Sequence, residues 1–166
     1  MTLQKYPALI KDYCSIISRR DNGDQYMSFH ELRFAKIIIL QENIAEVIIN
    51  EAVEIDNEMV SEYHDFLLQH LSAPFLLLIN KINSYTYTFD AQIKIASLPE
   101  IKAMAAVTYN KATEVATRNL VSLPRNNTWN IQIFPDRDTA LDWLTSLQSD
   151  PASPTHEERH NHNTRH

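Results

Sequence analysis

The sequence has 166 residues, and its 15 Lys and Arg against 21 Asp and Glu give a formal net charge of −6. The chain has one glycine, Gly23, which excludes a P-loop or a Rossmann turn, because both need several glycines where the backbone approaches phosphate. It has one cysteine, Cys14, which excludes an intrachain disulfide and any zinc site with two thiolates.

The two ends of the chain differ in character from its middle. Residues 1–28 carry a weak apolar pattern and then a polar run, which favours an N-terminal extension that is a short helix or disordered. Residues 149–166 are rich in histidine and contain no large apolar residue, so we expect a disordered tail. A single domain is therefore predicted over residues 29–148.

Apolar residues are not arranged for a membrane or for export. No apolar run approaches the roughly 18 residues that a membrane span needs. The N-terminus has no sustained apolar segment of the kind found in signal peptides. We therefore expect a cytoplasmic protein that does not span a membrane.

Two strands are predicted at the start of the domain. Residues 34–40 (FAKIIIL) and 44–50 (IAEVIIN) are rich in β-branched side chains, and a polar turn of residues 41–43 joins them. This pattern is typical of an antiparallel hairpin.

A helix and a buried strand are predicted next. Asp56 is a suitable N-cap, and Pro74 separates the helix from residues 75–82, a continuous apolar run that indicates a strand buried on both faces. The helix is indicated by apolar residues at three- and four-residue spacing: Met59, Val60, Tyr63, Phe66, Leu67 and Leu71.

Helices and strands alternate in the remainder. A helix is predicted over residues 88–97, with Phe89, Ile93 and Ala96 facing inward. Residues 102–109 predict a strand, and Asn110 can cap the helix that follows. The expected inner face of that helix is Ala112, Val115, Ala116, Leu120 and Leu123.

The last two elements complete the order. Residues 129–134 alternate like a strand, and Asp136 or Asp138 caps a final helix. Its inward residues are expected to be Ala140, Leu141, Leu144 and Leu147. The order β-β-α-β-α-β-α-β-α predicts an α/β fold with a mixed, mostly parallel sheet led by an antiparallel hairpin, with helices packed on it.

Four strings carry a likeness to a known family. They are the FAKIIIL and IAEVIIN hairpin, FLLLINKINSYTYT, KAMAAVTYN, and WNIQIFPDRDTALDWL. Together with the element order, they resemble the SpoIIAA-like branch of the STAS superfamily over residues 32–148. The parent group contains anti-sigma-factor antagonists and the cytoplasmic domains of sulfate transporters, and the branch is also compared with the CRAL-TRIO lipid-transfer fold. The resemblance implies a STAS-like fold.

One departure from the family concerns its phosphorylated serine. The antagonists carry this serine in an Asp-Ser-Ser-Gly-like turn that opens a helix, whereas residues 85–89 here read Tyr-Thr-Tyr-Thr-Phe. Thr86 or Thr88 could accept phosphate at the helix N-terminus, where the dipole favours an anion. The alternative is that these hydroxyls only cap the helix.

Candidate ligand-binding residues follow two of the predicted strands. In open α/β sheets, ligands bind beyond the carboxyl ends of parallel strands. We expect a small anion or a lipid head group there, and the alternative is that the residues form turns and caps. The candidates are Lys81, Asn83, Tyr85, Tyr109, Asn110 and Lys111.

A long acidic stretch provides a candidate docking surface. Between Ile37 and Asn80 there is no Lys or Arg, which disfavours nucleic-acid binding through this half of the domain. Glu54, Glu58 and Glu62 are candidates for docking a basic protein partner, and the alternative is a solvated face.

No set of residues predicts catalysis or a metal. His64 and His70 are six residues apart and cannot share a helix face, and the acidic residues are expected on polar faces or caps. We therefore predict a non-catalytic regulatory or protein-interaction module, without cofactor or metal, in which a homo-oligomer is possible. The alternative is a carrier or sensor of a small apolar or lipid-like ligand, held in a pocket between sheet and helices.

Overall fold

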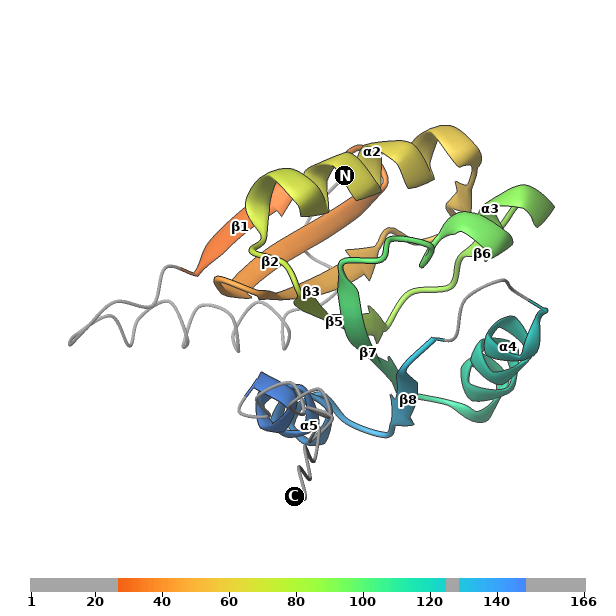
Figure 1. The fold of residues 1–166 in the computed structure, drawn as a ribbon. Coiled ribbons are helices and arrows are strands. Elements are labelled where there is room, and N and C mark those ends of the chain that lie inside the picture. The colour runs from red at the N-terminus through yellow and green to blue at the C-terminus, as the bar shows by residue number, and fades with distance from the viewer. Residues whose placement is uncertain (1–26, 125–128, 149–166) are drawn as a thin grey trace, which may run out of the picture.

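A six-stranded sheet forms the centre of the molecule (Figure 1). The computed structural model describes residues 27–124 and 129–148. The strands of this sheet are β1 (Ser28–Glu31), β2 (Ala35–Gln41), β3 (Ile44–Ile49), β5 (Phe75–Lys81), β7 (Ile101–Thr108) and β8 (Ile131–Phe134). They lie in the order β1-β2-β3-β5-β7-β8, in which β1, β2 and β3 pair antiparallel and β3, β5, β7 and β8 pair parallel. The predicted mixed sheet led by an antiparallel hairpin is confirmed.

Helices cover both faces of this sheet. They are α2 (Asn57–His70), α3 (Phe89–Lys94), α4 (Lys111–Ser122) and α5 (Arg137–Gln148). Helices α2, α3 and α4 lie on one face, and α5 lies on the other (Figure 1). Helices α2, α3 and α4 share a face because each connects two adjacent parallel strands of the sheet. Right-handed crossovers that run in one direction along a sheet place their helices on the same side.

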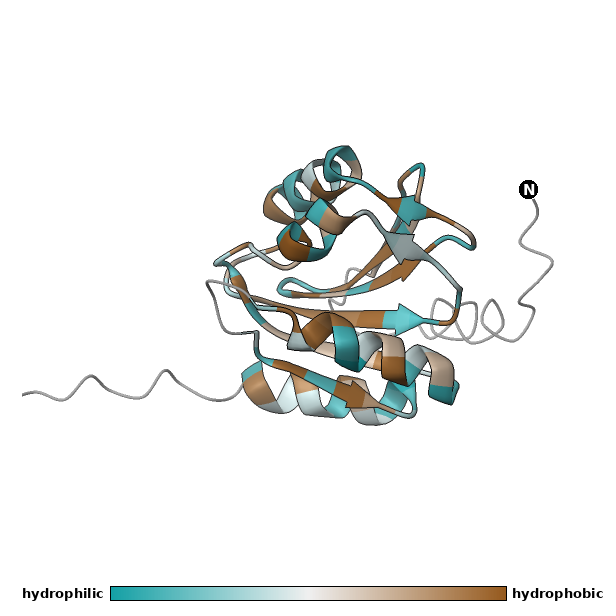
Figure 2. Ribbon diagram, turned by 90° about the vertical axis from the view of Figure 1, so that its right-hand side faces the viewer, coloured by the Kyte–Doolittle hydropathy of each residue, from teal (hydrophilic) through white to brown (hydrophobic). Residues whose placement is uncertain are grey.

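Side chains of the central strands alternate between two hydrophobic clusters. In β3, Val47 and Ile49 pack in the cluster under α2, whereas Ile44 and Ile48 pack in the cluster under α5. Every residue of β3 is therefore buried. The central strands are predominantly hydrophobic in Figure 2, as expected for a sheet that is covered on both faces.

Helix α2 forms as its sequence predicts. The Asp56 side chain accepts a hydrogen bond from the Met59 N–H at 2.8 Å, which caps the helix. Five residues of the apolar stripe are buried: Val60, Tyr63, Phe66 and Leu67 in the helix, and Leu71 directly after it. Burial of this stripe stabilises the helix more than its intrinsic propensity does.

Two small features were not predicted. Strand β1 extends the sheet by pairing antiparallel with β2, although its apolar signal is weak and Phe29 is exposed. A second, two-stranded sheet pairs β4 (Glu54–Ile55) with β6 (Thr86–Tyr87) in parallel. Strands of two residues are too short for an alternating pattern to show in the sequence.

The predicted inner face of α3 is wrong for two of its three residues. Phe89 and Ile93 are 74% and 43% exposed, whereas Ala96, just after the helix, is buried as predicted. The buried residue of the helix itself is Ala91. The helix has only six residues, and the Thr88 N–H donates to the Ile55 carbonyl immediately before it. Pairing between β4 and β6 therefore sets how the helix is turned, and its hydrophobic side chains do not.

The predicted inner face of α4 is also wrong. Ala112, Val115 and Ala116 are exposed, and the buried residue of the helix is Thr117. The Thr117 hydroxyl donates to the Thr113 carbonyl at 2.8 Å, so it is buried without an unsatisfied polar group. Leu120 and Leu123 are partly buried, in line with the prediction.

Helix α5 confirms the prediction in its two buried residues, Ala140 and Leu144. Of the two candidate caps, Asp136 accepts the hydrogen bond, from the Thr139 N–H at 2.8 Å. The Trp143 ring packs against Phe134 at a centroid distance of 5.5 Å. Trp143 and Met27 border the same cluster under α5.

Parts of the predicted organisation lie outside the described residues. These are most of the N-terminal extension and the histidine-rich tail of residues 149–166. Within residues 27–124 and 129–148, no helix is both long and apolar enough to cross a membrane.

Candidate functional site

A pocket of about 50 Å³, open to solvent, lies between the sheet and the helices α2, α3 and α4. Its floor consists of Val47, Ile49, Ile79, Lys81, Met104, Ala106 and Ile131. Its walls consist of Ile55, Tyr63, Tyr85, Tyr87, Ile95, Ala96, Thr117, Leu120, Val121 and Trp129. The lining is predominantly apolar, as in most small-molecule sites.

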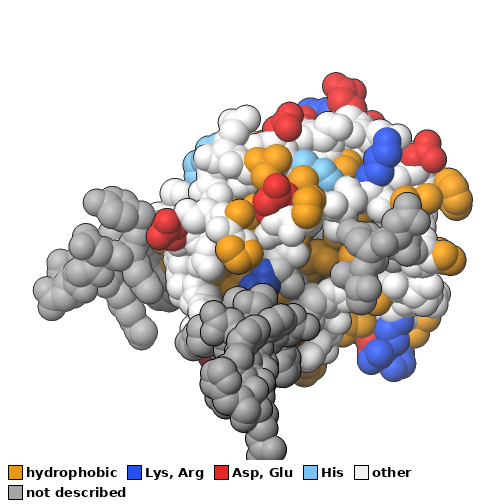
Figure 3. Space-filling model, viewed as in Figure 1, with side chains coloured by type: hydrophobic (Ala, Val, Ile, Leu, Met, Phe, Trp, Pro, Cys, Tyr) orange, Lys and Arg blue, Asp and Glu red, His pale blue; other side chains and the backbone are white. Residues whose placement is uncertain are grey.

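The pocket exists because the helices do not cover this face completely. Helix α3 ends after six residues, and α4 presents Thr117 to the sheet where a leucine or phenylalanine would fill the space. Opposite Thr117, β7 contributes the small side chain of Ala106. In Figure 3, hydrophobic side chains lie in a recess near the middle of the view.

Lys81 is the cation of the pocket. Its ammonium nitrogen lies 5.2 Å from the centre of the Tyr85 ring, a cation–π arrangement. No carboxylate of the described residues forms an ion pair with it. Burial lowers the pKa of Lys81 from 10.5 to about 8, because the charged form loses hydration. The side chain is thus mainly cationic near neutral pH.

Three tyrosines lie beside Lys81 in the pocket. The Tyr85 and Tyr87 rings meet edge to face at a centroid distance of 5.6 Å. Burial raises the pKa of Tyr87 to about 12 and raises the pKa of Tyr63 and of Tyr85 above the ordinary value. All three hydroxyls therefore stay protonated at neutral pH. The Tyr85 hydroxyl is buried, and its interaction with the Tyr87 hydroxyl adds to the rise in the pKa of Tyr85 that burial causes.

Only two of the six predicted ligand residues line the pocket: Lys81 and Tyr85. The Asn83 side chain donates to the Ile49 carbonyl at 2.8 Å, which fixes the loop after β5. Tyr109 lies near Glu46 on the α5 face of the sheet, where burial of the phenol and the charge of Glu46 raise its pKa. The predicted set is thus divided between the two faces.

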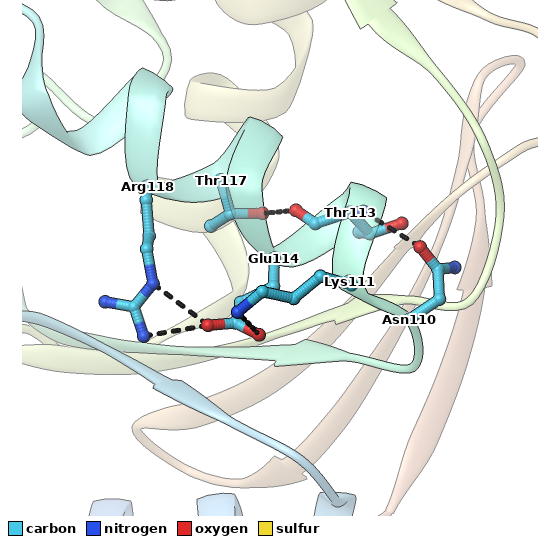
Figure 4. A network of polar contacts seen from close by, with 6 residues as sticks. All are labelled: Asn110, Lys111, Thr113, Glu114, Thr117 and Arg118. Carbon is cyan, nitrogen blue, oxygen red and sulfur yellow. Dashed lines mark hydrogen bonds and ion pairs between the residues drawn. The ribbon is translucent and has the colours of Figure 1, made fainter.

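The other two predicted ligand residues, at the start of α4, have structural partners (Figure 4). The Asn110 side chain accepts a hydrogen bond from the Thr113 N–H at 2.9 Å and caps the helix. The Lys111 ammonium pairs with Glu114 at 3.1 Å, and Arg118 pairs with the same carboxylate at 3.0 Å. These contacts agree with the alternative that Asn110 and Lys111 belong to a cap.

The two candidate phosphate acceptors occupy different positions. Thr88 is the N-cap of α3, and its hydroxyl accepts from the Ala91 N–H at 3.4 Å, as the capping alternative requires. Thr86 is exposed in β6. Phosphorylation at either residue stays a prediction.

The three candidate docking glutamates are at the surface, and two of them lie near one arginine. The Arg33 guanidinium lies 3.0 Å from Glu62 and 3.8 Å from Glu58. Glu54 is exposed in β4. Arg33 therefore offsets part of the negative charge of this surface.

Sequence reasoning missed a buried ion pair on the opposite face. It placed all acidic residues on polar faces or caps, but Glu46 is 0% exposed in β3. Its carboxylate pairs with Arg137 at 2.8 Å and accepts from the Asn80 side chain at 2.9 Å. A glutamate inside an otherwise apolar strand signals a buried partner of opposite charge. Arg137, however, lies 91 residues further along the chain, so no local pattern identifies it as that partner.

The two histidines of α2, His64 and His70, contact different residues. The His64 ring donates to the Ile95 carbonyl at 3.0 Å. His70 stacks on Phe66 and lies 4.9 Å from the ring of His30 in β1. The described residues contain no group of three or more His, Cys, Asp or Glu side chains that could hold a metal ion.

Comparisons with known proteins bear on the fold. A scan against protein-family models finds no match, and neither does a search of curated proteins. Among solved structures, the chain is similar to a protein of the DUF3478 family from Shewanella loihica PV-4, which is described as having a SpoIIAA-like fold. The two share 16% sequence identity over 75% of this chain and 98% of the other, with a TM-score of 0.42. We transfer no residue role or activity from this likeness.

Proposed function

We propose that this chain is a non-catalytic, cytoplasmic binding module that holds a small, mostly apolar ligand in the pocket between the sheet and α4. The observation that carries the proposal is the pocket itself. Its lining is apolar except for Lys81, Thr117, the hydroxyl groups of its three tyrosines and the indole N–H of Trp129. Empty apolar cavities reduce stability, because their walls lose packing contacts. The part of the pocket that holds Ile49 and Lys81 lies at the carboxyl ends of β3 and β5, where ligands bind in other open α/β sheets.

Filling the pocket should abolish binding. Ala106→Leu adds a branched side chain at the floor of the pocket, next to Met104. We expect 1-hexanol to shift the methyl NMR signals of Ile79, Ile95 and Met104 in the native protein, and to shift them at least about tenfold less at the same concentration in this variant. A hexyl chain is short enough to enter through the open side of the pocket.

Ala116→Leu is the matched control, because it makes the same substitution on the exposed face of α4. This variant should bind 1-hexanol like the native protein. The proposal is wrong if hexanol shifts no pocket methyl in the native protein, or if Ala106→Leu remains folded and the shifts persist.

A regulatory or protein-interaction role is the second candidate. Phe89 and Ile93 are exposed one turn apart on α3, directly after β6, and the strand paired with β6 carries exposed Glu54. An exposed aromatic residue beside acidic side chains is typical of a contact surface for a basic partner.

Two changes test this second role by affinity purification from native cells. Phe89→Ser with Ile93→Ser removes the exposed apolar pair, and Glu58→Lys with Glu62→Lys reverses the nearby charge. Both should reduce recovery of a specific partner, whereas Val115→Ser, at a comparably exposed residue of α4, should not. Equal recovery with all variants would refute the role.

A further inference from the structure

One cation and two tyrosines lie in contact with one another in the pocket. Lys81 lies against the ring of Tyr85, and Tyr85 lies against Tyr87. The remaining floor around them is Val47, Ile49, Ile79, Met104, Ala106 and Ile131. A ligand that fits this lining is amphipathic, with one polar head and an apolar body.

We propose that the ligand is a small monocarboxylate, whose carboxylate is bound by the Lys81 ammonium and the Tyr85 hydroxyl while its apolar body lies over Ile79 and Met104. This inference rests on the proposed function, because it names the class of ligand that the same pocket takes. It adds a charge requirement that a simple apolar site would not have.

Charge decides between the possible head groups. A cationic head would be repelled by Lys81, and a neutral alcohol would cover the partly buried ammonium without supplying a counter-ion. A phosphate monoester carries nearly two negative charges at neutral pH, and the described lining of the pocket contains no Lys or Arg besides Lys81. A single carboxylate matches a single ammonium.

The hydroxyl of Tyr85 supplies a second donor. Its oxygen is buried beside the Tyr87 hydroxyl, and a ligand carboxylate is a stronger acceptor for its proton than that neutral hydroxyl. The tyrosine keeps its proton near neutral pH because burial raises its pKa. One oxygen of the ligand can therefore accept from Lys81 and the other from Tyr85.

The size of the pocket limits the body of the ligand. About 50 Å³ corresponds to roughly three to five water-sized groups. A short aliphatic or branched body therefore fits the interior, and a longer chain would extend through the open side.

Three probes of equal chain length separate the head groups: hexanoate, 1-hexanol and hexylammonium. We expect the native protein to bind hexanoate at least about tenfold more tightly than 1-hexanol, since a hydrogen bond to a charged group is usually worth that ratio. Hexylammonium should bind more weakly than either. Affinities are measured from the methyl NMR shifts of Ile79 and Met104.

Lys81→Met keeps the length of the side chain and removes its charge. This variant should lose at least about tenfold in affinity for hexanoate and keep its affinity for 1-hexanol. Lys94→Met, at an exposed position of α3, is the matched control and should bind all three probes like the native protein.

The outcomes distinguish the two proposals. If hexanoate and 1-hexanol bind equally, and Lys81→Met changes neither affinity, the carboxylate proposal is wrong and the apolar binding function stands. If none of the probes shifts the pocket methyls, or if Ala106→Leu folds and still binds 1-hexanol, the proposed function is wrong and the carboxylate proposal falls with it.

Discussion

Arg137→Met should lower the free energy of unfolding by about 3–5 kcal/mol, because it leaves a buried carboxylate without its counter-ion. Glu46 is fully buried in the middle of the sheet, and Arg137 begins α5 and approaches it at 2.8 Å. Methionine fills much of the same space, so the loss reflects the unpaired charge more than a cavity. Urea denaturation at pH 7 measures the effect.

Two further variants make this test specific. Arg118→Met removes an arginine that pairs with Glu114 on the surface of α4, and it should change stability much less. Adding Glu46→Leu to Arg137→Met removes both charges and should recover most of the lost stability. A small effect of Arg137→Met, comparable with that of Arg118→Met, would show that the pair does not anchor α5.

Lys81→Met should raise the stability of the ligand-free protein at pH 7, by up to about 3 kcal/mol. The pKa of Lys81 falls from 10.5 to about 8 when the chain folds, so the folded state holds this proton less tightly than the unfolded state does. A charged Lys81 therefore opposes folding. Urea denaturation at pH 7 compares the variant with the native protein.

The same shift predicts how stability depends on pH. The unfolded chain binds more protons at Lys81 than the folded chain between about pH 8 and pH 10.5, so stability due to this group rises with pH across that window. Tyr63, Tyr85 and Tyr87 face Lys81 across the pocket, and their raised pKa values oppose the rise above about pH 10. The comparison is therefore made from pH 7 to pH 9.5.

Lys94→Met provides the control for both measurements, because Lys94 is exposed on α3. Its stability should follow that of the native protein at each pH. If Lys81→Met is no more stable than this control, or if the rise from pH 8 to 9.5 remains in Lys81→Met, then burial of Lys81 does not cost stability.

Periodicity predicted the elements that bury many large side chains. Helix α2 and strand β5 carry long apolar patterns, and both lie where the sequence places them. The pattern failed in α3, which has six residues, and in α4, where alanines do not define a face. A short helix or a weak apolar stripe gains too little from its own burial to determine its orientation, so neighbouring elements determine it.

The candidate site was also predicted only in part. Lys81 and Tyr85 were predicted because ligands lie at the carboxyl ends of parallel strands, a rule that needs only the order of elements. The same rule also named Tyr109 and Asn110, which the structure places outside the pocket lining. The rule locates an edge of the sheet, but it does not say on which face each side chain lies.

The sequence by itself determined the order of the helices and of strands β2, β3, β5, β7 and β8, the antiparallel hairpin of β2 and β3, and the burial of the central strands, because these depend on apolar patterns local to each segment. Only the tertiary structure decided the pairing of Glu46 with Arg137, the face that α4 turns inward, and the pocket around Lys81. Each of these joins residues that are far apart in the chain. Such contacts depend on how all the layers pack together, and no local pattern contains that information.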